Sequence, residues 1–114
     1  MLSRSHRLTN DQDFSRIYRH GRQSSTAHLR LSYVLSGKSS NQNSRFGFVV
    51  SKKHAVKIVD RNRIKRVLRD ETRKLLRNFS KTVDAVVAAR PGIAKLSGSA
   101  IREEYVTLLG KAKL

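Results

Sequence analysis

The chain has 114 residues, of which 38% are hydrophobic, and 25 Lys and Arg against 8 Asp and Glu give it a net charge of +17. This length predicts a single domain over residues 1–114 with one modest core, and the charge favours a nucleic-acid partner over an anionic membrane. The absence of cysteine excludes disulfides and thiolate metal sites. No apolar run approaches the roughly 20 residues that span a bilayer, and the N-terminus has no apolar signal segment, so we expect a cytoplasmic protein without a membrane anchor.

The first regular element expected is a short helix from Asn10 to His20, after an irregular basic arm over residues 1–7. Thr9 stands three residues before Gln12, in the form of a capping box, and Gly21 supplies a stop. Apolar residues then recur at i, i+3 and i+4, namely Phe14, Ile17 and Tyr18. This spacing predicts one apolar helix face.

Strands are expected next. Residues 27–35 alternate between apolar and polar side chains, which is typical of a half-buried strand, and a short extended segment over residues 22–26 leads into it. Residues 36–44 (SGKSSNQNS) predict a polar loop. Residues 46–50 (FGFVV) read as a more buried strand that delivers Lys52 and Lys53 at its end.

The segment from Lys52 to Arg77 holds eleven Lys and Arg residues against three acidic ones, and it also predicts a helix. Asp60 is a candidate N-cap. At about 100° per residue, one face collects Ile64, Val67, Leu68, Leu75 and Phe79, and the opposite face collects Asn62, Arg66, Arg69 and Arg73. A merely solvated helix is the plainer interpretation, but like charges without acidic partners at i+4 repel one another. An anionic partner would relieve that repulsion, and guanidinium groups suit phosphate.

The remaining chain predicts one more strand and one more helix. Residues 83–89 form a third apolar run of strand length, broken by Arg90-Pro91-Gly92. Ser97 or Ser99 can cap a last helix that ends at Gly110 and carries Ile101, Tyr105, Leu108 and Leu109. The order of elements predicts an α/β sandwich with helices packed on a sheet.

No catalytic site is visible in the sequence. The four histidines are scattered without the paired spacing of a metal site, and no glycine-rich phosphate loop or carboxylate cluster occurs.

Two motifs, FGFVVSKK over residues 46–53 and RNRIKRVLR over residues 61–69, together resemble the protein subunit of bacterial ribonuclease P. The resemblance extends to Asp13-Phe14, Tyr18, His20 and Gly21 near the start, and to Ala89-Arg90-Pro91 after the last strand. The chain departs from the family pattern at Ile58, often Ala, at Asp70, often Glu, and in the loop 54–59, which lacks a glycine.

The resemblance implies an α+β, two-layer sandwich of αβββαβα order with a left-handed βαβ crossover. It implies a monomer that binds the ribonuclease P RNA subunit one to one and also binds precursor tRNA. In that family the RNA, with Mg²⁺ bound mainly by RNA, hydrolyses the 5′ leader. The implied contacts with the RNA subunit are Arg61, Asn62, Arg63, Lys65, Arg66 and Arg69. A cleft for the single-stranded leader is implied at Phe14, Tyr18, Lys52 and Lys53.

Alternatives remain open for these residues. Phe14 and Tyr18 could be the core face of their helix, with Ile17 as the other candidate for that packing, and Arg63 lies far enough around its helix to brace the fold instead. A structural rRNA-binding protein would share the basicity without needing exposed aromatic rings. A DNA-binding helix-turn-helix is disfavoured because a strand, not a helix, is predicted before the basic helix.

Overall fold

The computed structural model describes residues 11–35, 44–75 and 83–112. The expected N-terminal arm, the Thr9 capping box, most of the loop after residue 35, and Arg77 and Phe79 lie outside the described residues. The elements are α1 (Asp11–His20), β1 (Arg22–Ser25), β2 (Leu29–Leu35), β3 (Arg45–Val49), α2 (Ile58–Leu75), β4 (Val83–Ala89), the 3₁₀ turn η3 (Ile93–Lys95) and α3 (Gly98–Lys111). This is the predicted αβββαβα order with one additional short turn.

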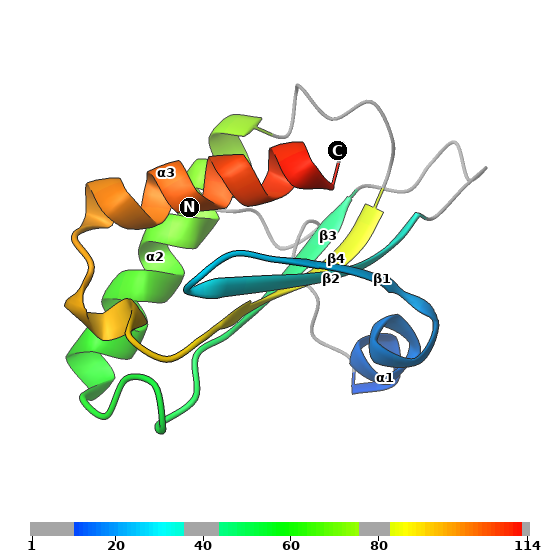
Figure 1. The fold of residues 1–114 in the computed structure, drawn as a ribbon. Coiled ribbons are helices and arrows are strands. Elements are labelled where there is room, and N and C mark those ends of the chain that lie inside the picture. Colours follow the sequence, from blue (N-terminus) through cyan, green and yellow to red (C-terminus); the bar gives the residue numbers. More distant parts are fainter. Residues whose placement is uncertain (1–10, 36–43, 76–82, 113–114) are drawn as a thin grey trace.

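The strands form a single mixed sheet in the order β1-β2-β4-β3. β1 and β2 are an antiparallel hairpin, β2 and β4 are antiparallel, and β3 and β4 are parallel. A parallel pair needs a crossover connection, and α2 lies in it. In Figure 1 β3 lies behind β4 and α2 lies above both, which makes the turn from β3 through α2 to β4 left-handed, as the resemblance implied and against the general right-handed preference.

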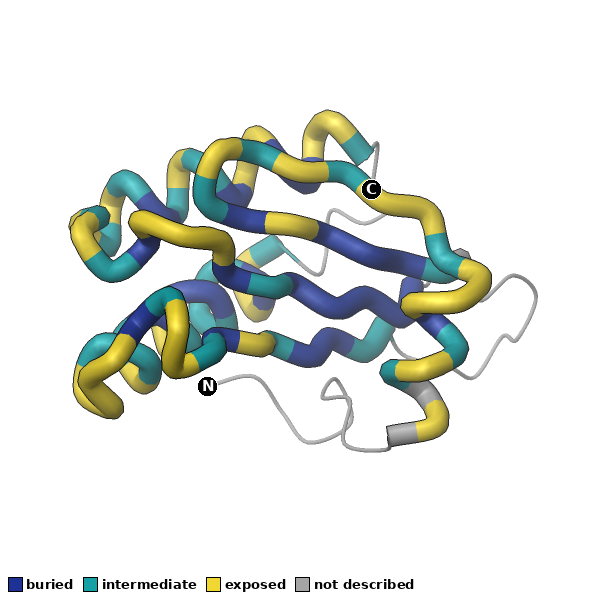
Figure 2. The backbone as a smooth tube through the Cα atoms, turned by 60° about the horizontal axis from the view of Figure 1, so that its bottom comes forward, coloured by how far each residue is buried: buried dark blue, intermediate teal, exposed yellow. Residues whose placement is uncertain are grey.

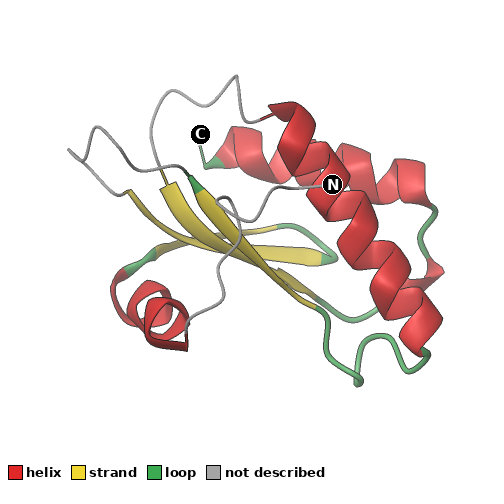
Figure 3. Cartoon of the chain, turned by 180° about the vertical axis from the view of Figure 1, so that it is seen from behind, coloured by secondary structure: helices red, strands yellow, loops and turns green. Residues whose placement is uncertain are grey.

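The two faces of the sheet are covered unequally. α2 and α3 lie together over one face and form the main sandwich, whereas α1 packs alone on the opposite face (Figures 1 and 3). Successive strand residues point to opposite faces, so β2 and β4 each contribute to two hydrophobic clusters. The large cluster faces α2 and α3, and the small one consists of Ile17 and Val86 with Phe14 and Val34 packed against them.

The main core is built from the apolar residues that the sequence patterns selected. Ile64 and Leu68 of α2 and Ile101 and Leu108 of α3 are fully buried against β2 and β4. Figure 2 shows this burial concentrated in the strands and on the inner sides of the helices. The buried Thr72 hydroxyl lies 2.6 Å from the Tyr105 hydroxyl and donates to the Leu68 carbonyl at 2.8 Å, so a polar pair joins α2 to α3 within the core.

The structure decides three predictions about where helices begin and end. α2 begins at Ile58, so the prediction of Asp60 as N-cap is wrong; the carboxylate instead lies in the first turn, where it still favours the helix dipole. The cap of α3 is Ser97, whose side chain accepts from the Ala100 N–H at 3.2 Å. α3 ends at Lys111, one residue past the expected Gly110. None of the described helices is long and apolar enough to span a bilayer.

Candidate nucleic-acid interface

Helix α1 buries one side chain of its apolar stripe and exposes another. Ile17 is fully buried against Val86, a packing that stabilises the fold by about 1.5–3 kcal/mol. Phe14 is half-buried beside it, and Tyr18 keeps 49% of its surface exposed. Ile17 therefore anchors α1, and the Tyr18 ring remains accessible at the sheet.

α1 covers only part of its face of the sheet. Its contacts fall on the row of residues that contains Val86 and on the row that contains Val34. Two residue pairs beyond the row of Val86, on the same face, the strand register aligns a row that crosses all four strands: Ser25, Arg30, Ala88 and Val49. Three of these four are exposed and Ala88 is half-buried. We call Ser25, Arg30, Ala88 and Val49 the open row.

The open row carries a cation that sequence reasoning did not single out. The alternating pattern marks Arg30 only as a polar position of a strand, yet its charge acts on Tyr18 of α1. Burial raises the pKa of the Tyr18 hydroxyl, and the Arg30 guanidinium opposes that rise. Arg30 donates to the Gln23 side-chain oxygen of β1 at 2.7 Å. An exposed ring next to an exposed guanidinium is an arrangement suited to single-stranded nucleic acid.

Lys52 and Lys53 follow the end of β3. β3 ends at Val49, a member of the open row, and the chain continues through a turn in which both lysines are exposed. α1 packs on the rows of Val86 and Val34, toward the other end of the sheet, so the open row lies between α1 and the turn that carries the two lysines.

The outer face of α2 forms a second basic surface. Asn62, Arg66 and Arg73 are exposed, and Lys65 and Arg69 are partly exposed. α2 lies on the opposite side of the sheet from α1 (Figure 3). The two surfaces therefore face different directions and can engage different segments of nucleic acid at once.

Two arginines of the RNRIKR motif are directed to the protein itself. Arg61 donates from Nη1 to the carbonyls of Ala55 and Val56 at 3.0 and 2.9 Å, which fixes the loop that carries the lysines. Arg63 donates to the carbonyls of Leu96 and Ala94 at 3.1 and 3.2 Å, which ties α2 to the segment before α3. The bracing position considered for Arg63 is therefore observed.

A buried carboxylate positions α1 on the sheet. Asp84 of β4 is 3% exposed and accepts from Arg16 of α1 at 2.6 Å and from Nε and Nη2 of Arg45 of β3 at 3.1 and 2.8 Å. Burial acts to raise the pKa of Asp84, but the hydrogen bonds and charges of Arg45 and Arg16 outweigh it and hold that pKa below its ordinary value. The sequence offered no signal for this pairing, since the three residues are far apart in the chain.

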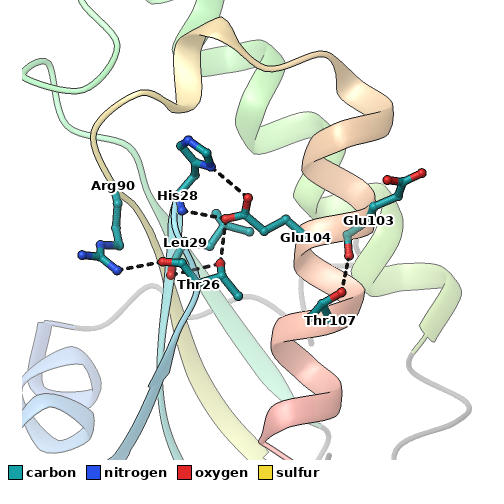
Figure 4. A network of polar contacts seen from close by, with 7 residues as sticks. All are labelled: Thr26, His28, Leu29, Arg90, Glu103, Glu104 and Thr107. Atoms are coloured by element: carbon teal, nitrogen blue, oxygen red, sulfur yellow. Dashed lines mark hydrogen bonds and ion pairs between the residues drawn. The ribbon is translucent and has the colours of Figure 1, made fainter.

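A second carboxylate holds the β1–β2 hairpin to α3 (Figure 4). Glu104 accepts from the Thr26 hydroxyl at 2.6 Å and from the His28 N–H at 2.7 Å, and its other oxygen lies 2.9 Å from His28 Nδ1. Arg90 donates to the Thr26 carbonyl at 2.7 Å. Burial acts to raise the pKa of Glu104, but these hydrogen bonds lower it overall. His28 thus has a structural position at a hairpin.

The described residues do not assemble a metal centre of their own. In residues 11–35, 44–75 and 83–112, no group of three or more His, Asp or Glu side chains is placed to hold an ion.

The sequence is similar to known proteins over nearly its whole length. The family model described as Ribonuclease P matches residues 2–113. The chain is 32% identical over 114 residues to the ribonuclease P protein component of Syntrophomonas wolfei, covering 100% of this chain and 92% of that one. It is 35% identical over 114 residues to that of Microcystis aeruginosa, covering 99% and 95%.

Solved structures give the same result for the fold. The RNase P protein of Staphylococcus aureus superposes with a TM-score of 0.84 at 27% identity, covering 95% of both chains. The RNase P protein of Thermotoga maritima superposes with a TM-score of 0.79 at 27% identity, covering 92% of this chain and 96% of that one. From its α+β fold, its sequence and the match over nearly its whole length, this chain belongs to the ribonuclease P protein component family.

Proposed function

We propose that this protein is the protein subunit of ribonuclease P, in which it binds the catalytic RNA and the single-stranded 5′ leader of precursor tRNA. The observation that carries the proposal is the family match over residues 2–113. The two separate basic surfaces support it, because a subunit of this kind must hold two RNAs at the same time. It acts as a monomer, one to one with the RNA, in the cytoplasm where tRNA is matured, and it does not act on DNA.

The outer face of α2 is the proposed contact with the RNA subunit. Asn62, Lys65, Arg66 and Arg69 present donors along one side of a rigid helix, and a guanidinium can give two hydrogen bonds to one phosphate. Arg61 and Arg63 support this surface by fixing the segments on either side of it.

The open row, with the α1 aromatics beside it, is the proposed leader site. Bases stack on Phe14 and Tyr18, and Lys52 and Lys53 neutralise phosphates. Stacking contributes about 1–3 kcal/mol per base and does not depend on base identity, which suits a protein that meets leaders of many sequences.

The reaction itself is assigned to the RNA subunit with its Mg²⁺. The protein contributes binding and orientation of the leader, and its positive charge reduces the repulsion between RNA phosphates that cations must otherwise screen. Cleavage with the protein should therefore need less Mg²⁺ than cleavage by the RNA alone.

The testing experiment is cleavage of a 5′-extended precursor tRNA at low Mg²⁺. It compares the protein alone, a bacterial ribonuclease P RNA alone, and the two together. Cleavage at the mature 5′ end only in the mixture supports the proposal. If adding the protein does not increase cleavage by an RNA that is active at high Mg²⁺, the proposal is refuted and a structural rRNA-binding protein is favoured. The exposed Tyr18 ring is an observation against that second function.

A further inference from the structure

The open row contains one cation in a position to hold the leader backbone next to the stacking ring. We infer that Arg30 binds a leader phosphate beside the base stacked on Tyr18, and that Gln23 is the positioning residue that orients its guanidinium. This inference rests on the proposed function, since it assigns residues to the same leader site.

The placement of Arg30 follows from the strand register. Arg30 pairs with Ser25 of β1 and with Ala88 of β4, so its side chain rises from the half of the sheet face that α1 leaves open. Arg30 is exposed, and its charge reaches the Tyr18 hydroxyl. A nucleotide stacked on that ring would therefore have its phosphate within the field of the guanidinium.

The guanidinium is oriented and still has donors to give. Its Nη2 donates to Gln23 Oε1 at 2.7 Å, which is the one hydrogen bond that the Arg30 side chain makes within the described residues. No carboxylate among those residues forms an ion pair with it. An arginine has five N–H donors in a rigid plane, so a guanidinium held at one nitrogen can present a fork to an anion.

The chemistry favours phosphate over a base edge. Ser25 and Ala88, the neighbours of Arg30 in the open row, have short side chains, so a backbone can approach the sheet closely. A phosphate contact carries no sequence information, whereas an arginine directed to a guanine edge would select one base.

The test uses the reconstituted holoenzyme and two precursor tRNAs, one with a single-nucleotide leader and one with a long unpaired leader. Arg30→Ala should raise KM for the long-leader substrate about tenfold with kcat unchanged, the size of one lost hydrogen bond to a charged group. It should leave the single-nucleotide substrate unaffected. The slope of log affinity against log salt should fall by about 0.7, as for one single-strand phosphate.

A matched control removes one positive charge from the other face of the same hairpin. Arg22 is exposed and pairs with Tyr33, whose ring lies in the core under α3, so Arg22→Ala changes net charge equally without touching the open row. Arg22→Ala should change KM for the two substrates by the same factor. Gln23→Ala should show a smaller loss than Arg30→Ala, and the double variant should be no weaker than Arg30→Ala alone if Gln23 acts through Arg30.

The outcomes separate the two proposals. If the wild-type holoenzyme has the same KM for both substrates, the proposed leader site is refuted, and the inference about Arg30 is refuted with it. If the wild-type holoenzyme has a lower KM for the long-leader substrate, and Arg30→Ala keeps that lower KM and melts like the wild type, only the inference about Arg30 is overturned. A loss confined to leaders with one particular base, with an unchanged salt slope, also overturns the phosphate assignment.

Discussion

The pairing of Asp84 with two arginines should make the placement of α1 depend on this carboxylate. Asp84→Asn keeps the size of the side chain but removes its charge and one acceptor oxygen. The carboxylate accepts three hydrogen bonds from Arg16 and Arg45 and is 3% exposed. Hydrogen bonds to charged groups contribute about 1.5–3 kcal/mol each.

The full sum will not be lost, because the side chains of Arg16 and Arg45 are 40% and 36% exposed and water can solvate them in the variant. We expect Asp84→Asn to lower the free energy of unfolding by about 2–3 kcal/mol, which corresponds to a drop in Tm of roughly 10 °C for a domain of this size.

The dependence on pH gives a second test of the same pairing. The folded-state pKa of Asp84 is lowered, so its stabilising effect is complete above the unfolded value of about 3.9 and is lost as pH falls through the folded value. The stability difference between wild type and Asp84→Asn should therefore be constant above about pH 5 and shrink in more acid solution.

The assay is urea unfolding followed by circular dichroism from neutral pH into the acid range. Glu103→Gln serves as control, because Glu103 is exposed on α3 (Figure 4) and its loss changes the net charge by the same amount. An Asp84→Asn protein as stable as the control at neutral pH, or a difference that grows in acid, would refute the reasoning.

Three further predictions follow from the other contacts. Arg63→Ala should lower the free energy of unfolding by about 1–2 kcal/mol, because two backbone carbonyls lose their donor. Arg66→Ala should change it by no more than about 0.5 kcal/mol in the same melt, because Arg66 is exposed, and should instead weaken binding to the RNA subunit. Gly21→Ala should lower the free energy of unfolding by at least about 1–3 kcal/mol, since a methyl group there would lie 2.8 Å from the Tyr33 carbonyl oxygen; an unchanged urea midpoint would contradict this. Glu104→Gln should cost about 1–2 kcal/mol near neutral pH, and the difference from wild type should fade as pH falls through the lowered pKa of Glu104; a difference that persists in acid would argue against the hairpin contact.

Much of the fold was predictable because its signals are local. The alternation in residues 27–35 and the apolar run at 83–89 predicted β2 and β4, and the stripe of Ile64, Val67 and Leu68 predicted the buried face of α2. Such periodicity depends only on the geometry of a helix or strand with one side buried. The start of α2 was predicted too late because Asp60 is equally favourable in a first helical turn.

For the candidate site, the sequence by itself determined that the chain is strongly basic, that α2 carries an arginine-rich face and that Phe14 and Tyr18 share a helix side. Only the tertiary structure decided which of these groups face outward. Ile17 fills the small core and leaves Tyr18 exposed, while Arg61 and Arg63 are directed to backbone carbonyls. Strand pairing across the sheet places Arg30 near Tyr18, and Asp84 meets arginines from two other elements. These outcomes depend on contacts between residues distant in the chain, and a side chain's own position along its helix or strand carries no information about them.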